Sequence, residues 1–458
     1  MNRTDPPGPP NEAFGRNHIA EMRRDLVGFC DRLWREYGDV VHFRLGPFPC
    51  YQFIHPEHIQ EVFVRKAKSF HKPARLKQVF GRFEGNGLVV SDGELWSRQH
   101  RLVQPAFQTA RLHSYASVIT ECVGRMLDGW KEETVVDFSA EMRRLTLRIV
   151  TRTLFSTAVD DEVDQIGEAV DAIQRWSMRE MNRVLATPRW LPLFGQPKAR
   201  RAIAFIDRLV RRIIRERRAS KMRADDLLGR LLDAVDNEGD RKRVTDRQVR
   251  DELVTLLLAG HETSAAALIW AGWLLARHAD VQKPVANQVR AVLGNRPPGY
   301  ADLPQLVEVE QALKEAMRLY PPVYFLSRQV AETVEIAGYE LPPLSQVYMN
   351  PFLTQRDPRW FPEQEKFDPL RFTPGKEEQL PPCAWFPFGA GPRACIGRGF
   401  AMMEGVLVLA SLLQRYHLEP APGQDEPKLE WQLSLHPKCG VRLAALPTGH
   451  PAQDIQRE

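Results

Sequence analysis

The chain lacks closely spaced cysteines. Its six cysteines are scattered over 458 residues, at Cys30, Cys50, Cys122, Cys383, Cys395 and Cys439, and no two of them form a C-x-x-C pair. Small disulfide-linked secreted domains and zinc ribbons need a denser, paired set. The sequence therefore favours a protein of a reducing compartment over a disulfide framework.

A strong excess of one charge is also missing. The formal net charge is +5, and no DNA- or RNA-binding motif occurs in the sequence. A helix predicted over residues 198–223 carries many arginines, but one of its faces is apolar. That pattern favours a solvated basic surface on a core helix over a membrane or nucleic-acid contact. We therefore expect no nucleic-acid partner.

Apolar residues are scarce at both ends of the chain. Residues 1–17 are polar and rich in proline, without the apolar run of a signal peptide or membrane anchor, and residues 447–458 are polar as well. This favours a soluble, cytoplasmic bacterial protein, or a chain from which a segment has been removed. We expect the two ends to be flexible tails. Over the whole chain, a hydrophobic fraction of 43% is enough for a large core.

One long stretch has the pattern of a helix. Thr245 and Gln248 form a capping box at its start, and it continues to about His278, a length on the order of 50 Å. Residues 253–276 are apolar enough to suggest a membrane span. The polar group at residues 261–263 argues against a span, because a charge at the bilayer centre is costly. We therefore expect a buried helix that crosses the domain.

The most specific signal is a glycine-rich segment at residues 388–397. It reads F-x-x-G-x-R-x-C-x-G and precedes an apolar helical run at residues 400–416. Glycines let the backbone pass close to a flat ligand. Cys395 stands where the loop meets the helix, and a helix N-terminus stabilises a thiolate. A thiolate held there is a good axial ligand for a haem iron. The alternative is a buried, inert cysteine in a glycine-rich turn.

This segment resembles the haem-binding loop of the cytochrome P450 family, with every fixed position filled. The resemblance covers nearly the whole chain. It implies a single, mostly α-helical α+β domain over residues 1–458, with haem b between the long helix and the helix after Cys395. It also implies that Cys395 binds the iron, that Arg393 contacts a haem propionate and that Phe388 covers the sulfur. Gly397 completes the cofactor-binding loop.

A second segment, residues 259–264, matches the family's oxygen-activating pattern A-G-x-[DE]-T-[ST]. The resemblance places Ala259 and Gly260 at the cofactor, where Gly260 permits a local widening of the helix. Thr263 would hydrogen-bond the distal oxygen, and Glu262 would relay protons from solvent. The alternative is a threonine bonded to a backbone carbonyl beside a surface glutamate. That alternative explains neither the glycine nor the spacing.

Further matches complete the predicted cofactor site. Trp96 and His100 are four residues apart and therefore share one helix face. Their N–H groups could hold a haem propionate, although packing in the core is the alternative for such a pair. His100 stands where the family usually carries an arginine. Arg328 resembles a second arginine on the propionates.

A structural motif supports the resemblance. Glu315 and Arg318 form an E-x-x-R pair on one helix face. The resemblance implies a buried ionic triad with Arg371, where the neighbouring Leu370 replaces the family's usual glutamate. We expect the triad to support the loop around Cys395 and to take no part in catalysis.

The implied activity is that of a haem-thiolate monooxygenase, which inserts one atom of dioxygen into a C–H bond or an alkene. Peroxygenases and isomerases of this type commonly lose the acid–alcohol pair that Glu262 and Thr263 form here, and a haem sensor would have little use for it. The presumed pocket is apolar, so we expect an apolar substrate such as a fatty acid, terpenoid, steroid or polyketide. Its predicted lining is Phe80, Phe83, Leu256, Val323 and Phe325.

A chain of this length leaves no room for a fused reductase beside the haem domain. We therefore expect electrons from NAD(P)H through a reductase and a ferredoxin or flavodoxin. An acidic partner would dock on the Cys395 face, with Arg98, Arg101 and Arg398 as predicted contacts, although ordinary solvation is the alternative for such arginines. We expect a monomer.

Overall fold

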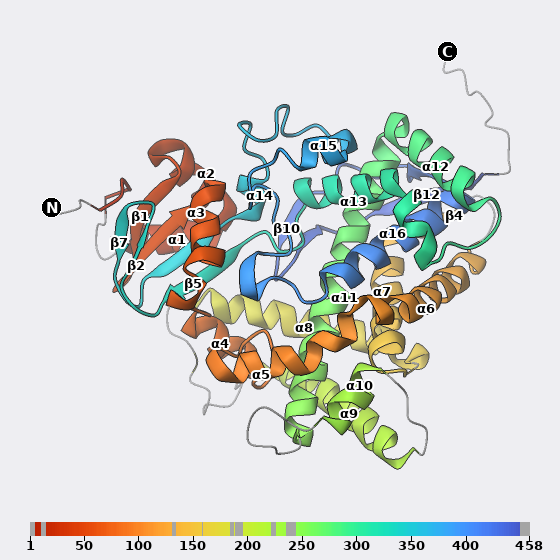
Figure 1. Ribbon diagram of the computed structural model, residues 1–458, viewed down its shortest axis with the longest axis horizontal. Helices are drawn as coiled ribbons and strands as arrows, with labels where there is room; N and C mark the ends of the chain where they lie inside the picture. The colour runs from red at the N-terminus through yellow and green to blue at the C-terminus, as the bar shows by residue number, and fades with distance from the viewer. Residues whose placement is uncertain are drawn as a thin grey trace.

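The computed structural model describes residues 5–10, 15–130, 134–157, 159–183, 187, 196–220, 226–234 and 244–448. Helices form most of the molecule, and the larger sheet lies at one side, beside the N-terminal helices (Figure 1). This agrees with the predicted, mostly helical α+β fold. The predicted flexible tails fall largely outside the described residues, so their flexibility stays a prediction.

The α-helices of the described residues are numbered in chain order. They are α1 (Arg16–Arg24), α2 (Leu26–Tyr37), α3 (Pro56–Gln60), α4 (Ala74–Phe80), α5 (Gly93–Val103), α6 (Thr109–Asp128), α7 (Phe138–Leu154), α8 (Val163–Met181), α9 (Pro197–Ala219), α10 (Leu227–Asp233), α11 (Asp246–Arg277), α12 (Ala279–Leu293), α13 (Val307–Leu319), α14 (Pro351–Thr354), α15 (Pro374–Glu377) and α16 (Arg398–Arg415).

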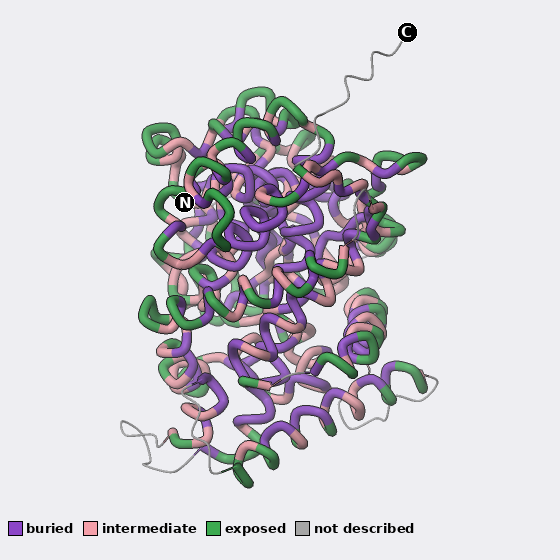
Figure 2. Tube along the Cα trace, turned by 90° about the vertical axis from the view of Figure 1, so that its right-hand side faces the viewer, coloured by how far each residue is buried: buried purple, intermediate pink, exposed green. Residues whose placement is uncertain are grey.

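The central helix is α11. The hydroxyl of Thr245 accepts from the backbone N–H of Gln248, and the Gln248 side chain accepts from the N–H of Thr245, so the predicted capping box is confirmed. The helix packs against α7, α9, α13 and α16. It is long and apolar enough to cross a membrane, but 72% of its most apolar window is buried inside the protein. The buried part of the chain fills the middle of the molecule (Figure 2). The prediction of a buried core helix is therefore confirmed.

The described strands form one mixed sheet and three smaller ones. The five-stranded sheet has the order β1-β2-β8-β5-β3, in which only the β2–β8 pair is parallel among the described strands. Residues 40–45 and 48–53 pair as an antiparallel hairpin, with Val40 opposite Phe53 and Leu45 opposite Phe48. The strands are β1 (Val40–Leu45), β2 (Phe48–Phe53), β3 (Phe70–His71), β4 (Thr134–Asp137), β5 (Leu326–Val330), β6 (Val334–Ile336), β7 (Tyr339–Leu341), β8 (Gln346–Met349), β9 (Tyr416–Pro420), β10 (Leu429–Trp431), β11 (Leu435–Pro437) and β12 (Arg442–Pro447).

The predicted helix near the N-terminus is interrupted in the structure. The apolar spacing predicts a single helix over residues 18–37, but the structure has α1 and α2 with a break at Asp25, whose backbone is extended (φ −153°, ψ 93°). The Asp25 side chain accepts from the N–H of Gly28 at 2.9 Å and so caps α2. Aspartate is a favoured N-cap residue, and the cap ends one helix and starts the next.

The predicted ionic triad is confirmed. Both side chains of the Glu315–Arg318 pair are fully buried, and Arg318 donates to the two carboxylate oxygens at 2.6 and 2.8 Å. Arg371 lies 3.3 Å from the same carboxylate. Arg318 also donates to the backbone carbonyls of Gln355, Gln364 and Lys366. The triad thus holds the irregular segment that leads to the loop of Cys395.

Candidate active site

One cavity brings most of the predicted site residues together. It lies between α11, the Cys395 loop with the start of α16, and α5. The predicted residues that line it are Trp96, His100, Ala259, Gly260, Thr263, Arg393, Cys395 and Gly397. Glu262, Arg328 and Phe388 lie outside its described lining. The sequence therefore identified most residues that line this cavity, whereas three of the predicted residues lie outside the lining.

The predicted apolar lining is confirmed only in part. Leu256 lines the cavity. Phe80 and Phe83 pack on each other with ring centroids 5.4 Å apart, and Phe325 packs on Tyr348 at 5.2 Å. These aromatic residues and Val323 stand outside the described lining. The apolar wall consists instead of Leu88, Val89, Phe107, Val150, Leu154, Leu256, Ile396 and Phe400.

The Cys395 loop has the backbone that its glycines predict. Gly389 and Gly391 both have φ of +67°, and a Cβ on Gly391 would lie 1.9 Å from the carbonyl oxygen of Phe63. Only glycine tolerates that combination of conformation and close approach. The N–H of Cys395 donates to the carbonyl of Phe388 at 2.8 Å, and α16 begins three residues later. The loop therefore holds the sulfur at the cavity wall.

Two opposing influences act on the Cys395 thiol. Burial raises its pKa, while the N–H of Gly397 and the positive charge of Arg398 lower it. The helix-start environment that the sequence predicts is thus present, but burial outweighs it in the protein alone. A thiolate at this position therefore needs a further positive charge in front of it.

Three cations form one group, Lys72, Arg328 and Arg393, of which Lys72 and Arg393 line the cavity. The Arg393 guanidinium stands 4.2 Å from the centre of the Trp96 ring, donates to the carbonyl of Ser91 and pairs with Asp92. Arg328, which β5 carries, lies over the ring of Phe63 at 4.7 Å. The rings of Trp96 and His100 are 5.0 Å apart.

The charges of this group are not balanced. Burial and then the charges of Arg328 and Arg393 lower the pKa of Lys72 to about 7. Burial and Arg393 lower the pKa of Arg328 to about 10. Asp92 is the carboxylate that pairs with Arg393, and Lys77 shares it at 2.6 Å. Among the described residues, positive charge therefore exceeds negative charge in this group, which suits an anionic ligand at the cavity.

Lys72 is the member of this group that the sequence did not reveal. It lines the cavity but stands in a stretch without periodicity, far in sequence from Arg328 and Arg393. Such a lysine carries no local motif. Only the fold, which places β3 beside β5, brings it to the other cations.

Thr263 faces the cavity from the middle of α11. Its hydroxyl donates to the carbonyl of Ala259 at 2.6 Å, which is the bond that the alternative interpretation predicts. The helix is α-helical from Asp246 to Arg277, so the expected widening does not interrupt it. A Cβ on Gly260 would lie 3.2 Å from Val150, so glycine relieves crowding there. The hydroxyl is therefore at the cavity, with its own hydrogen bond to the backbone.

Glu262 lies away from the cavity. It is 4% exposed, and its Oε1 lies 2.5 Å from Nε2 of His436, a residue of β11. Its Oε2 lies 3.7 Å from Nε2 of His261. Burial alone would raise the pKa of Glu262, but the hydrogen bond and the charge of His436, with His261 and Arg143, lower it to about 2. The Glu262 carboxyl is therefore a carboxylate that is stabilised mainly by its hydrogen bond to His436.

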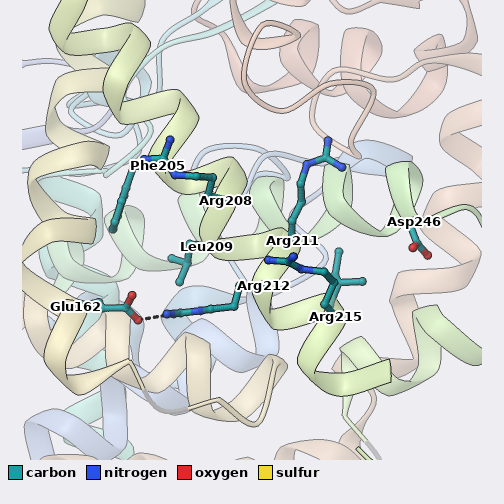
Figure 3. Close-up of a pocket in the computed structure, with 9 residues that line it drawn as sticks. Glu162, Phe205, Arg208, Leu209, Arg211, Arg212, Arg215 and Asp246 are labelled. Carbon is teal, nitrogen blue, oxygen red and sulfur yellow. Dashed lines mark hydrogen bonds and ion pairs between the residues drawn. The ribbon is translucent and has the colours of Figure 1, made fainter. Parts of the chain in front are cut away.

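A second hollow lies along α9, far in sequence from the Cys395 loop (Figure 3). It has a volume of about 580 Å³ and is lined by Arg208, Arg211, Arg212 and Arg215 together with Glu162 and Asp246. Arg212 donates to Glu162 at 2.5 Å, and Arg211 donates to Asp207 at 2.7 Å. Arg211 and Arg212 on this basic face therefore form ion pairs, as expected for a solvated surface.

Comparison with known proteins agrees with the resemblance to the cytochrome P450 family. The family model described as Cytochrome P450 matches residues 6–441. Cyclooctatin synthase of Streptomyces melanosporofaciens is 36% identical over 423 residues, which cover 92% of each protein. Pentalenene oxygenase of Streptomyces avermitilis is 32% identical over 94% of this chain and 96% of its own. Cyclooctat-9-en-7-ol 5-monooxygenase of Streptomyces melanosporofaciens is 32% identical over 87% and 88%. With the Cys395 loop and the buried triad in place, these matches show that the chain belongs to the cytochrome P450 family, as a haem-dependent monooxygenase.

Proposed function

We propose that Cys395 is the iron ligand of this monooxygenase and that its substrate is an apolar terpenoid. One observation supports the proposal: Cys395, Thr263 and two cations, Lys72 and Arg393, line the same cavity. A haem-thiolate site needs an iron ligand, a hydroxyl on the oxygen side and groups that bind the propionates, and residues of these three types line this cavity from segments far apart in sequence.

The residues present fit a haem. The excess of positive charge at Lys72, Arg328 and Arg393 is what two propionate groups would balance, with the N–H groups of Trp96 and His100 beside them. The Cys395 thiol faces the cavity, and the surrounding protein raises its pKa, so it needs a positive charge to ionise, which an iron supplies. Gly391 gives the loop its close packing on Phe63.

Haem supplies the activation of dioxygen when it is bound. The chain supplies the surroundings. Cys395 provides a thiolate ligand, and Phe388 holds the ligand's N–H through its carbonyl. Arg393 and Arg328 orient the propionates. Thr263 places a hydroxyl in the cavity, and Glu262, one residue earlier in the helix, passes protons toward it.

The terpenoid proposal rests on the relatives and on the cavity wall. Two relatives bear the names of the compounds that they oxidise, pentalenene and cyclooctat-9-en-7-ol. The described wall of the cavity is mostly aliphatic, with Leu88, Val89, Val150, Leu154 and Leu256. Such a wall excludes water and suits a compact hydrocarbon skeleton.

Electrons would come from a separate ferredoxin or flavodoxin with an NAD(P)H reductase. Arg398 is exposed at the start of α16, where its guanidinium lies 5.8 Å from the ring centre of Phe388. Arg101 is exposed on α5, and Arg98 is partly exposed on the same helix. These positive charges beside the Cys395 loop favour an acidic partner.

Reconstitution tests the proposal. The purified protein is given NAD(P)H, a ferredoxin and its reductase, with pentalenene, cyclooctat-9-en-7-ol, palmitate or a steroid as substrate. We expect a terpenoid to shift the haem to high spin and to yield a product that carries one oxygen atom from dioxygen. Product only from palmitate or the steroid would contradict the terpenoid assignment. Product formed only with hydrogen peroxide would favour a peroxygenase.

A further inference from the structure

We propose that His436 is a positioning residue that holds Glu262 away from the cavity and supplies the proton that Glu262 passes to Thr263. The inference rests on the proposed relay role of Glu262 and goes beyond it, because it names the source of the proton. His436 lies 174 positions after Glu262 and belongs to no motif of the sequence.

Helix geometry requires the separation of Glu262 from Thr263. Consecutive residues of an α-helix point about 100° apart, so neighbouring side chains do not share a face. Thr263 lines the cavity, and Glu262 consequently points into the packing between α11 and its neighbours. A proton on Glu262 therefore reaches Thr263 only after the carboxyl turns.

The carboxyl sits in a continuous buried chain of polar groups. Thr146 of α7 lies 3.0 Å from Nδ1 of His261, and the other ring nitrogen of His261 lies 3.7 Å from Glu262. On the far side, Nε2 of His436 lies 2.5 Å from Glu262 and 2.9 Å from the hydroxyl of Ser434. All five side chains are at most 4% exposed.

Strand β11 holds His436 against α11. Trp270 of α11 donates its indole N–H to the carbonyl of Leu435 at 2.9 Å, one residue before His436. The contact is thus built into the fold. Among the described residues, the side chain of His436 lies at hydrogen-bond distance from Oε1 of Glu262. The other carboxylate oxygen, Oε2, is buried without a hydrogen-bond partner.

The charges explain why a separate donor is needed. The pKa of Glu262 is about 2, so at neutral pH the group is an anion without a proton of its own. Arg143 of α7 adds to this effect, and Asp171 of α8 is the other carboxyl that faces it. A ring nitrogen of His436, which lies 2.5 Å from this carboxylate, is in position to donate a proton to it.

The proposed transfer moves protons only. One proton leaves Nε2 of His436 for Oε1 of Glu262, and the neutral carboxyl turns and gives the proton to the Thr263 oxygen, which releases its own hydroxyl proton into the cavity. Water returns one proton to His436. In total, one proton passes from solvent to the cavity through Thr263, and no electron moves.

Infrared spectroscopy of the holoenzyme tests the pairing without turnover. His436→Gln leaves Glu262 buried without its charged partner, so we expect a protonated-carboxyl band at pH 7 that the wild type lacks. The band should vanish in the double variant Glu262→Gln/His436→Gln. Other buried carboxyls, such as Glu404 with a pKa of about 8, contribute the same background to each spectrum. If His436→Gln adds no band, His436 does not hold Glu262 as an anion, and the inference fails.

Kinetics test the proton supply. We expect His436→Gln to lower kcat by on the order of 10²-fold and to leave KM unchanged. Combined with Glu262→Gln it should cause no further loss, because both act in one path. The control is His417→Gln, which alters a half-exposed histidine 3.6 Å from Glu419, and it should keep kcat. Losses that multiply, or full kcat in His436→Gln, would overturn the inference. Full kcat in Glu262→Gln would instead refute the relay role itself, whatever the infrared result.

Discussion

Removal of Glu315 should destabilise the fold strongly. The side chains of Glu315 and Arg318 are both 0% exposed, and Arg371 shares the same carboxylate. Glu315→Ala leaves buried positive charge without its partner, which costs about 3–5 kcal/mol. Unfolding entropy is about 2.1 cal/mol/K per residue, or about 1 kcal/mol/K for this chain, so the melting temperature should fall by about 3–5 °C. Because the triad holds the segment before the Cys395 loop, haem loading should fall as well.

Calorimetry and the ratio of haem to protein absorbance measure both effects. The matched control is Glu310→Ala on the same helix, where Glu310 is 42% exposed and pairs with Lys314 at 2.9 Å. Exposed pairs contribute about 0–1 kcal/mol, so this variant should melt within about 1 °C of the wild type. If Glu315→Ala melts like Glu310→Ala and carries full haem, the triad does not support the loop.

Three further predictions follow from the site. Thr263→Ala should consume NAD(P)H at a near-normal rate but yield less product and more hydrogen peroxide, with unchanged substrate affinity; full product yield per NAD(P)H would make Thr263 a packing residue. Burial and the charge of Glu252 raise the pKa of Glu84 from 4.5 to about 8, so Glu84 lowers stability progressively as pH rises through this range. Glu84→Gln should therefore raise the melting temperature more at pH 8 than at pH 5, and an equal change at both would contradict the assignment. Arg98→Glu should slow reduction by ferredoxin, and salt should slow the wild type; rates indifferent to both would reject electrostatic docking.

The sequence predicted correctly those features that depend on residues close together in the chain. The capping box at Thr245 and the apolar run after it fixed the start and burial of α11, because both depend on residues close in sequence. The apolar spacing did not predict the break at Asp25, because the apolar residues keep their helical spacing across it. A capping aspartate was its only sequence signal.

The parts of the site that were missed are contacts between distant segments. Lys72 meets Arg328 only because β3 pairs with β5, and His436 meets Glu262 only because β11 packs on α11. The direction of Glu262, in contrast, was available from the sequence. Adjacent helical residues point different ways, so Glu262 and Thr263 could not both face one cavity.

The central claim is that Cys395 binds the haem iron as a thiolate. The most direct measurement is the absorption spectrum of the reduced protein with carbon monoxide. The wild type should show the strongly red-shifted Soret band of thiolate ligation, and Cys395→His should lose it while still binding haem. A red-shifted band that persists in Cys395→His would contradict the account.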